Sequence, residues 1–593
     1  MKIIMKRIYL PLLCLSLFSC VSRKIEEKMK MESLDLKDEI TKLLAQGKTE
    51  LNLPKGRYKI SEAIHINNTK SLTINGNGST LIMPPKGELL FFSNIQNIHI
   101  KNLTVDCDPL PFTQGTITKI SDDHLEYEYE VHPGYPSLDA FPKYKTIGRS
   151  GIFVFDPKTL RWKDNVPDLY TKDSTSISLR KGQFTFKHLM EGYRNIKVGD
   201  YVAFKNMYGN VFLFKGCGDV TMEDVIVNTG PGAGFLMRTC TGKVIMKRCK
   251  IEKGPKPKGA VHERLLSTIA DGFNLAYSRQ GVTMEECEFS YMGDDAVNLH
   301  GSFMSVVKKI DDSTFLIGRA WSDEPLQKVL PGDKIRILDG NDFGLINEAK
   351  ILNLMKIIPP QELDQNLRKK WRLPTKAKIF YSQVKLDKKV NAEAGNKVEV
   401  PAIACPNFVF RRNYFHDHRA RGLRLGASHG LIEQNRFERI KSTPISLGPH
   451  AIHNEGGWIE DIVVKNNTIM DSCFDERTFD KNAANTGAIV LLHFLHDKSA
   501  KYVQENRNIR ILNNKIERVG GPGLLITSAD NVTVEGNTFS NTHLLNCDKS
   551  GNDIRLKATG VISINYSDKV DIKNNYFGKL GSFARKEFIK NPE

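Results

Sequence analysis

The cysteines lack the spacings of a metal site or of a dense disulfide framework. Ten cysteines occur in 593 residues, with no Cys-x-x-Cys pair and no His/Cys cluster. Cys14 and Cys20 lie close to the N-terminus, and the other eight are scattered. A chain of this length forms a core without covalent staples, so we expect most cysteines to be small buried side chains. One or two disulfides stay open as an alternative.

No apolar run reaches the ~20 residues that a membrane-spanning helix needs. A shorter run, Ile8 to Phe18, follows a basic start. This order is typical of a signal peptide, here residues 1–20. Leu17-Phe18-Ser19-Cys20 resembles the lipobox of bacterial lipoproteins. The resemblance implies that Cys20 carries fatty acyl chains such as palmitate, that residues 21–34 form a tether, and that the protein is anchored to a membrane of a bacterial cell envelope. An ordinary secretory signal that contains Cys20 is the alternative.

The positive charge is not concentrated anywhere. The formal net charge is +17, which favours anionic glycans or surfaces as neighbours. Lys and Arg are spread along the chain, without a basic helix or a basic patch interleaved with aromatic residues. We therefore expect no nucleic-acid partner.

A short alternating unit recurs through the chain. It has the form apolar-x-apolar-x-x-Asn/Cys, as in residues 244–249, 282–287, 408–413, 509–514 and 532–537. Where nothing is inserted, successive units are 23 or 24 residues apart. Strands this short cannot bury a face alone, so we expect coils to stack as parallel strands ~4.7–4.9 Å apart around one core. The pattern predicts an all-β fold, a right-handed parallel β-helix, with the recurring Asn forming a side-chain ladder.

Two stretches interrupt the repeat. Residues 110–212 and 302–402 contain longer alternating strands and are predicted to be inserted antiparallel β-barrel-like domains. The β-helix then comprises residues 35–109, 213–301 and 403–593. Within the first of these, an amphipathic helix over residues 35–45 is predicted to cap the open edge of the first coil.

Acidic residues gather on two neighbouring coils, in Asp271-Gly272-Phe273-Asn274 and Gly293-Asp294-Asp295-Ala296-Val297-Asn298. When the apolar pairs of successive coils are aligned, two positions can be compared from coil to coil: the residue two before the pair and the residue between its members. The first position holds Ala233, Asp271, Asp295, Arg421, Thr443, Pro522 and Thr559, and the second holds Leu236, Asn274, Asn298, Arg424, Ser446, Leu525 and Ile562. Charge is therefore confined to the central coils, which a purely structural solenoid does not require.

Stacked carboxylates repel, so we expect one of them to have a raised pKa, as an acid catalyst near neutrality needs. Hydrolysis of a glycosidic bond needs a proton donor to the leaving oxygen and a second carboxylate for water or nucleophile. Asp271, Asp294 and Asp295 are thus the candidate catalytic residues. Two alternatives stay open: single aspartates that cap turns or pair with Arg421, and a calcium site built from all three.

Further candidates lie on the same coils. Asn274, Asn298, Arg421 and Arg424 are candidates for binding sugar hydroxyls, with bonding between coils as the alternative. His300 is a further substrate-binding candidate, and His416 and His418 lie nearby, although a lone His is more often structural. Trp458 is a candidate for stacking on a sugar face, and Glu455 is a candidate additional acid.

These motifs, the two insertions and the lipoprotein-like start resemble glycoside hydrolase family 110, the bacterial α-1,3-galactosidases that cleave blood-group B structures. More distantly, an Asp followed one coil later by Asp-Asp is similar to polygalacturonases, although the Gly-His-Gly motif of that family is missing.

The resemblance implies hydrolysis of terminal α-1,3-linked galactose from oligosaccharides with inversion, without nucleotide or metal cofactor. It also implies that Asp294 is the general acid and that Asp271 and Asp295 position and deprotonate water. Three alternatives remain: another β-helix hydrolase, a uronate lyase that the basic charge would suit, and a carbohydrate-binding solenoid that would not need the three aspartates.

Overall fold

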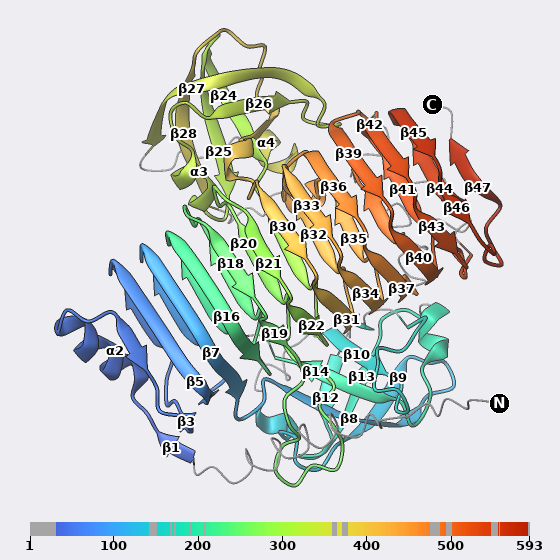
Figure 1. Ribbon diagram of the computed structural model, residues 1–593. Helices are drawn as coiled ribbons and strands as arrows, with labels where there is room; N and C mark the ends of the chain where they lie inside the picture. The colour runs from blue at the N-terminus through green and yellow to red at the C-terminus, as the bar shows by residue number, and fades with distance from the viewer. Residues whose placement is uncertain are drawn as a thin grey trace, which may run out of the picture.

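The computed structural model describes residues 31–590 apart from 141–150, 167–168, 171–172, 190, 207, 358–364, 371–377, 475–486, 494–500, 547–555 and 557. Cys20, the predicted signal peptide and most of the predicted tether lie outside these residues. Within them, short parallel strands stack into a long solenoid with two additional β-structures on its flanks (Figure 1). The predicted parallel β-helix is confirmed.

Three rows of parallel strands form the faces of the solenoid. The first row consists of β2 (Glu50–Asn52), β5 (Ser71–Met83), β7 (Asn97–Cys107), β16 (Asp219–Val227), β18 (Val244–Lys247), β21 (Val282–Glu285), β30 (Phe408–Arg411), β33 (Gly430–Glu433), β36 (Glu460–Lys465), β39 (Asn506–Leu512), β42 (Ala529–Glu535) and β45 (Asp568–Lys573). The second consists of β1 (Met31–Ser33), β3 (Arg57–Lys59), β19 (Lys250–Ile251), β22 (Glu288–Ser290), β31 (Tyr414–His418), β34 (Arg436–Ile440), β37 (Thr468–Ser472), β40 (Lys515–Val519), β43 (Thr538–Ser540) and β46 (Tyr576–Phe577).

The third row carries the candidate site. It is a separate sheet of β4 (Ile64–Asn67), β6 (Leu90–Ser93), β15 (Phe212–Lys215), β17 (Phe235–Arg238), β20 (Phe273–Ala276), β23 (Val297–His300), β32 (Leu423–Gly426), β35 (Ile445–Leu447), β38 (Ile489–Leu491), β41 (Leu524–Thr527), β44 (Gly560–Asn565) and β47 (Lys586–Lys590).

The register of this row agrees with the sequence alignment at the central coils. Asn274 pairs with Asn298, and Asn298 pairs with Arg424. At the C-terminal end the alignment is wrong by one residue, because Leu525 pairs with Ser563 and not with Ile562. It also omits one coil, since β38 lies between β35 and β41.

One continuous apolar core runs along the solenoid axis, from Leu36 to Ile564. Helix α2 (Leu36–Ala45) closes its N-terminal end: Leu36 and Ile40 are buried in the core and Leu44 packs against it. Asp35 accepts a hydrogen bond from the amide of Asp38 and so caps the helix. The predicted capping helix is therefore present.

A buried ladder of asparagines joins the later coils at the turn between the first two rows. Its members are Asn413, Asn435, Asn467, Asn514 and Asn537, with the half-buried Asn575 at the end. Each Nδ2 before the last rung donates to the side-chain oxygen of the next Asn and to a backbone carbonyl one coil back, as Asn467 does to Asn514 and Ile432. The predicted asparagine ladder is confirmed.

Both interruptions of the repeat form antiparallel β-structure. The first is a seven-stranded sheet of β8 (Phe112–Ile120), β9 (Glu126–Val131), β10 (Gly151–Phe155), β11 (Leu169–Tyr170), β12 (Asp173–Ser176), β13 (Lys181–Thr185) and β14 (Tyr201–Lys205). The second is a closed barrel of β24 (Met304–Asp311), β25 (Thr314–Ala320), β26 (Lys334–Leu338), β27 (Leu345–Ile357), β28 (Ile379–Leu386) and β29 (Lys397–Glu399), accompanied by α3 (Glu324–Lys328) and α4 (Gln365–Lys370).

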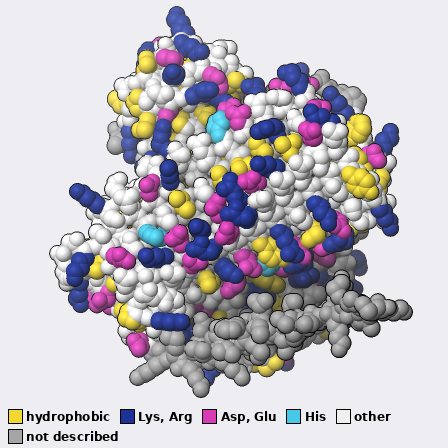
Figure 2. Space-filling view, viewed as in Figure 1, with side chains coloured by type: hydrophobic (Ala, Val, Ile, Leu, Met, Phe, Trp, Pro, Cys, Tyr) yellow, Lys and Arg dark blue, Asp and Glu magenta, His cyan; other side chains and the backbone are white. Residues whose placement is uncertain are grey.

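Seven cysteines fall in the described part of the chain, and all seven are buried. Among the described helices, none has the length and apolar character needed to cross a membrane. On the face shown in Figure 2, basic and acidic side chains are intermixed in a band across the coils. Arg411, for example, pairs with Glu285 and Glu433 on the two adjacent coils. Much of the basic charge is thus opposed by acids on neighbouring coils.

Candidate active site

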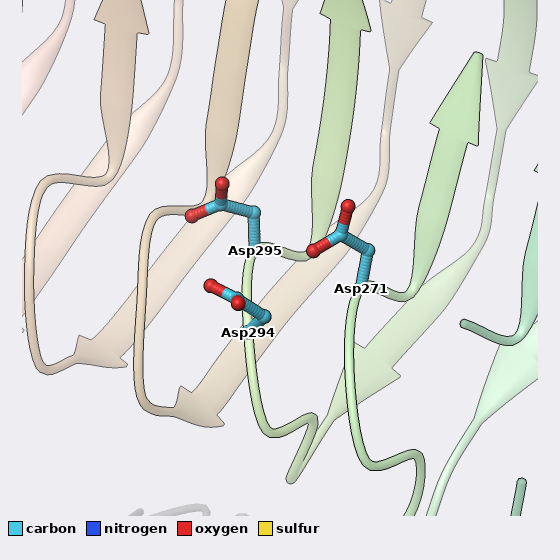
Figure 3. A group of neighbouring side chains, drawn as sticks. All are labelled: Asp271, Asp294 and Asp295. Carbon is cyan, nitrogen blue, oxygen red and sulfur yellow. The ribbon is translucent and has the colours of Figure 1, made fainter. Parts of the chain in front are cut away.

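The three aspartates lie just before the strands of two neighbouring coils (Figure 3). Asp271 precedes β20, and Asp294 and Asp295 precede β23, which pairs with β20. One carboxylate oxygen from each lies within 4.8 Å of the others. Asp295 is buried, Asp271 is half-buried and the Asp294 side chain is 39% exposed. The structure therefore brings all three candidates together and leaves Asp294 the most open.

Glycines beside the aspartates allow the coils to approach closely. A Cβ at Gly272 would lie 2.6 Å from the carbonyl oxygen of Ala296, and a Cβ at Gly293 would lie 2.2 Å from that of Ile269. Both distances are shorter than any tolerated contact, so a side chain at either position would push the two coils apart. The Gly in each motif therefore keeps Asp271 within reach of the Asp294-Asp295 pair.

Three arginines from the next coil oppose the acids. Arg419 donates to Asp294 Oδ1 at 2.9 Å and to the carbonyl of Gly293. Asp295 Oδ1 accepts from the backbone amide of Arg421 at 2.8 Å and from its guanidinium at 3.3 Å. Arg424 lies 3.6 Å from Asp295 Oδ2. Asp271 has no arginine this close among its recorded contacts; its partner is the Asn274 amide.

The carboxyls of Asp271 and Asp295 consequently differ in proton affinity. Burial, together with the charges of Asp294 and Asp295, raises the pKa of Asp271 well above its usual value. Burial also acts to raise the pKa of Asp295, but Arg421 and Arg424 outweigh it and lower that pKa. Asp271 is therefore the more readily protonated of the two and Asp295 the more readily ionised, which agrees with the expectation of one raised pKa.

Asn274 is used within the protein. Its Nδ2 donates to Asp271 Oδ2 at 2.7 Å, and its Oδ1 accepts from Arg238 at 2.7 Å. Because Arg238 can only donate, it fixes the orientation of the Asn274 amide. Asn274 therefore orients Asp271, and its predicted contact with a sugar hydroxyl stays a prediction. Arg238 has no signal in the aspartate motifs and was missed; only its place one coil earlier, at the end of β17, indicates it.

Asn298, Arg424 and His300 line the coil beside the acids. Asn298 is 4% exposed and His300 is 5% exposed. His300 Nδ1 lies 2.8 Å from the carbonyl of Gly301, and burial lowers its pKa to about 4. His300 is therefore neutral above that pH, and its Nδ1 is the protonated nitrogen.

The side chain of Trp458 contradicts the prediction that it stacks on a sugar. It is 3% exposed, packs in a cluster with Phe303, Phe343 and Tyr502, and donates from Nε1 to the carbonyl of Phe343 at 3.0 Å. Both its faces and its polar atom are used inside the protein. Gly456-Gly457 connects Trp458 to Glu455. The carboxylate of Glu455 forms an ion pair with Arg424.

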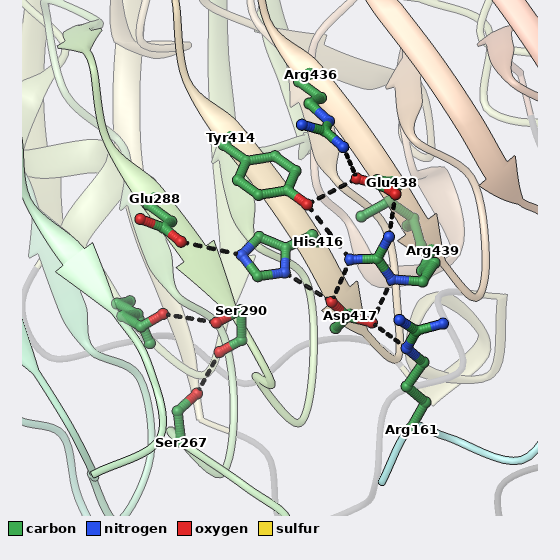
Figure 4. Close-up of polar contacts among 12 residues, drawn as sticks. Arg161, Ser267, Glu288, Ser290, Tyr414, His416, Asp417, Arg436, Glu438 and Arg439 are labelled. Carbon is green, nitrogen blue, oxygen red and sulfur yellow. Dashed lines mark hydrogen bonds and ion pairs between the residues drawn. The ribbon is translucent and has the colours of Figure 1, made fainter. Parts of the chain in front are cut away.

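Two nearby histidines have structural partners. His418 is buried, and its Nε2 lies 2.9 Å from the carbonyl of Arg421. His416 lies between two acids, 2.7 Å from Asp417 Oδ2 and 3.3 Å from Glu288 Oε1 (Figure 4). Asp417 also accepts two hydrogen bonds from Arg439 and pairs with Arg161 of the first insertion at 3.0 Å.

This network lies at the start of the turn that carries the site arginines. Arg439-Ile440-Lys441 has the Arg-Ile-Lys sequence of polygalacturonases, but Arg439 contacts Asp417 and Lys441 donates to the carbonyl of Val166 in the first insertion. The tripeptide therefore ties β34 to that insertion. Asp417, which heads the turn to Arg419 and Arg421, is held from three sides.

The three aspartates are also the one group in the described part of the chain whose acidic, His or Cys ligand atoms converge as a cation site would require. Oxygen donors of this kind suit Ca²⁺. The arginines already supply positive charge against Asp294 and Asp295, however, so the acids do not depend on a metal for compensation.

Comparisons with known proteins agree with the β-helix fold and find relatives named as glycosidases. The family described as right handed beta helix region matches residues 405–578. The sequence is 23% identical to alpha-1,3-galactosidase B of Akkermansia muciniphila, over 84% of this chain and 62% of that protein. It is 22% identical to alpha-1,3-galactosidase B of Phocaeicola vulgatus, over 83% of this chain and 86% of that one.

A solved structure, the endo-xylogalacturonan hydrolase of Aspergillus tubingensis, aligns with 94% of this chain and 95% of its own at 7% identity and a TM-score of 0.39. The chain spans less than two thirds of the Akkermansia relative. The expected resemblance to α-1,3-galactosidases is confirmed by the named relatives.

Proposed function

We propose that this chain is an exo-acting α-1,3-galactosidase that removes terminal, non-reducing α-1,3-linked galactose, from blood-group B structures and from linear α-1,3-galactosyl glycans. The observation that carries the proposal is the convergence of Asp271, Asp294 and Asp295 within 4.8 Å on two coils. The names of the relatives support galactose as the sugar removed.

The three aspartates have distinct roles in the proposal. Asp294, the most exposed, protonates the leaving glycosidic oxygen. Asp295, held as a carboxylate by Arg421 and Arg424, accepts a proton from water, and Asp271 helps to position that water. The raised pKa of Asp271 supplies a competing assignment, with Asp271 as the acid. Since the acids are coupled, only kinetics on single variants separates the two.

The charge balance favours a neutral sugar over a uronate. Arg419 is opposed by Asp294, Arg421 by Asp295, and Arg424 by both Asp295 and Glu455. None of these three arginines is left to neutralise a substrate carboxylate, which a uronate lyase or a polygalacturonase would have to bind. Glycans with uncharged terminal residues fit the site better.

Inversion is part of the proposal through the resemblance to the inverting family. Carboxyl groups of inverting glycosidases are generally ~6.5–9.5 Å apart and those of retaining enzymes ~5–5.5 Å. The closest oxygens here are within 4.8 Å, so the spacing by itself does not argue for inversion. The anomer released first decides the point.

The test uses an α-1,3-galactosyl disaccharide and the fucosylated B trisaccharide, with released galactose followed by ¹H NMR. We expect β-galactose first from the wild type and a loss of at least ~100-fold in kcat for Asp294→Asn. α-Galactose first would replace inversion with retention and make Asp295 the nucleophile. No galactose from either glycan would overturn the assignment.

A substrate with a good leaving group then identifies the acid. 2,4-Dinitrophenyl α-galactoside needs little protonation on departure, so the variant that lacks the general acid keeps most of its activity on it. We expect this rescue for Asp294→Asn and not for Asp271→Asn or Asp295→Asn. Rescue of Asp271→Asn alone would move the acid to Asp271.

We also propose that the chain is a lipoprotein of the bacterial cell envelope, anchored through Cys20. The support is the sequence Leu17-Phe18-Ser19-Cys20 after a basic and apolar start. Mass spectrometry of the N-terminal peptide from membranes is expected to give a diacylglyceryl-modified Cys20. In Cys20→Ser the protein is expected in the soluble fraction; unchanged membrane retention would contradict the anchor.

A further inference from the structure

A cluster of polar side chains lies beside the catalytic acids, on the side toward the C-terminal coils. It consists of Asn298, Arg424, His450 and Glu455, hereafter the Glu455 cluster. Asn298 pairs with Arg424 across β23 and β32, and His450 is bridged to Glu455 through their backbones. Arg424 joins the cluster to the acids, because it pairs with both Asp295 and Glu455.

The cluster is desolvated. Asn298, Arg424 and His450 are each at most 9% exposed, and the Glu455 side chain is 22% exposed. The pKa of His450 is lowered well below its usual value by burial and by Arg424 and Arg421, so the imidazole is neutral. Burial acts to raise the pKa of Glu455, but the positive charge of Arg424 outweighs it and lowers that pKa, so Glu455 is ionised.

Five polar atoms of the cluster make no hydrogen bond to any residue that the structure describes: Asn298 Oδ1, His450 Nε2, Glu455 Oε2, Arg424 Nε and Arg424 Nη2, although Arg424 Nη2 and Glu455 Oε2 lie in ion-pair contact with each other. Buried polar atoms in native proteins are nearly always hydrogen-bonded, so their concentration at one place needs an explanation. Asn298 Oδ1 and Glu455 Oε2 are pure acceptors, the two Arg424 nitrogens are pure donors, and a neutral imidazole supplies an acceptor or a donor.

Hydroxyl groups are the ligand chemistry that fits these atoms. Each hydroxyl donates one hydrogen bond and accepts others, which suits acceptors beside an arginine. A bound cation is disfavoured by Arg424, and a bound anion by Glu455. A neutral pyranose satisfies the cluster without burying further charge.

We propose that Glu455 binds a ring hydroxyl of the terminal sugar, with Asn298 and His450 binding others, so that the Glu455 cluster sets which sugar the site accepts. This rests on the proposed function in placing the scissile bond at the aspartates, and it assigns the sugar to the C-terminal side of them. Glu455 is then a specificity residue and not a further acid, as the sequence alone had suggested.

A substrate series tests the assignment. The wild type, Glu455→Ala and Glu455→Gln are assayed on 4-nitrophenyl α-galactoside and its 2-, 3-, 4- and 6-deoxy analogues. A site built to bind a hydroxyl rejects the analogue lacking it by up to ~10⁴–10⁵-fold. We expect one deoxy analogue to lose at least ~100-fold in kcat/KM with the wild type, and to lose less than ~5-fold further in Glu455→Ala.

If the loss from Glu455→Ala and the loss from removing a hydroxyl add together for every analogue, the role of Glu455 is overturned. Glu455→Gln keeps the shape of the side chain and one acceptor oxygen. Its kcat/KM is therefore expected to lie between those of the wild type and Glu455→Ala, with the loss mainly in KM. Glu535→Gln is the matched control, because Glu535 at the end of β42 also pairs with a basic residue, Lys573, but lies away from the aspartates. This variant is expected to behave as the wild type. Thermal melting checks that each variant is folded. The loss of activity of the wild type on one deoxy analogue is measured independently of any variant.

The inference is separable from the proposed function. If the wild type cleaves no α-galactoside, binding is tested directly by saturation-transfer NMR with free galactose, glucose, mannose and N-acetylgalactosamine. A sugar that binds the wild type and not Glu455→Ala supports the cluster even though the galactosidase assignment has failed. Equal binding to both, or binding of none of the sugars, overturns it.

Discussion

Asp271 and Asp295 occupy the same position on successive coils, yet their proton affinities are shifted in opposite directions. The coil repeat gives the two aspartates the same backbone surroundings, whereas the side chains on the coils next to each aspartate differ. On the next coil Asp295 meets Arg421, whereas the coil before Asp271 places Ala233 at that position. Arginines on one side only, Arg421 and Arg424, therefore break the equivalence of the stacked acids.

Asn274 provides a residue-scale prediction, because its hydrogen bond lowers the raised pKa of Asp271. In Asn274→Ala that stabilisation of the carboxylate is lost, and the pKa of Asp271 rises further. If Asp271 must be ionised to position water, the acidic limb of the kcat/KM profile moves to higher pH. Measurement of the profile from pH 4 to 9 checks the direction.

Asn531→Ala is the control for this shift. Asn531 donates to Asn508 in an exposed ladder on the outer face of the coils, so the variant removes the same chemistry away from the site. Its profile is expected to overlie that of the wild type. An unchanged limb in Asn274→Ala would mean that Asp271 acts in its protonated form, as the competing assignment for the acid requires.

At the scale of elements, the asparagine ladder explains how coils of short strands keep their register. Asn467 donates to Ile432 and Asn514 and accepts from both the backbone and the side chain of Asn435. In Asn467→Ala, a buried amide and a buried carbonyl lose their partners. We expect a loss of about 2–4 kcal/mol in the free energy of unfolding, measured by urea denaturation.

The end of the same ladder is the comparison. Asn575 is half-buried on the last rung, where water can replace its bonds to Val534 and Lys573 and can take over as acceptor for the backbone and side-chain amides of Asn537. Asn575→Ala is therefore expected to cost less than about 1 kcal/mol. Equal costs at the two positions would show that the ladder is not a cooperative buried element.

The barrel of the second insertion contains an element-scale pH dependence at Glu399 of β29. Burial, opposed by Arg336 and reinforced by Glu460 and Glu505, raises the pKa of Glu399 from 4.5 to about 7. The folded protein therefore retains a proton that the unfolded chain releases between those values, and stability falls as pH rises through this window. Glu399→Gln removes the dependence.

The variant is expected to match the wild type below pH 4.5 and to exceed it above pH 7, by up to about 3 kcal/mol from the size of the shift. Melting temperatures at pH 4.5 and 8.5 give the comparison. Glu348→Gln is the control, because Glu348 also pairs with Arg336 but its pKa is lowered; this variant is expected to lose stability at pH 8.5. A lower melting temperature for Glu399→Gln at pH 8.5 would contradict the prediction.

At the scale of the whole molecule, the sequence predicted the solenoid because its first row alternates clearly between buried and exposed residues. The third row stops alternating from β20 to β44: β44 is buried at all six positions, and β20, β23 and β32 at all four. Without alternation a one-residue slip leaves no trace in the pattern, which is why the register failed at Ser563.

The site was predictable to the extent that it follows the repeat. Asp271, Asp295, Asn298 and Arg424 occupy aligned positions, so the coil period indicates that they meet. Arg419 and His450 lie in turns outside the strands, and Trp458 follows a loop whose path depends on the barrel. Their environments come from tertiary packing, which no periodicity encodes.

The first insertion contacts the site through Arg419. The Phe153 ring of β10 lies 5.6 Å from the Arg419 guanidinium, which in turn binds Asp294. Arg161, a few residues further on, pairs with Asp417 at the start of the same turn. The insertion therefore supports the turn at two points, and the ring limits the orientations open to the arginine that holds the proposed acid.

Phe153→Leu tests this support while keeping the core of the insertion apolar. A desolvated cation–π contact contributes about 1–2 kcal/mol, so a loss of about 5- to 30-fold in kcat/KM is expected if Arg419 then holds Asp294 less well. Phe184→Leu is the matched control, because Phe184 is buried in the same sheet and stacks on Tyr127, outside the contact with Arg419. That variant is expected to lower the melting temperature with kcat/KM unchanged. If both variants lose stability and neither loses activity, the insertion is a scaffold only, and the orientation of Arg419 is set by its bonds to Gly293 and Asp294 alone.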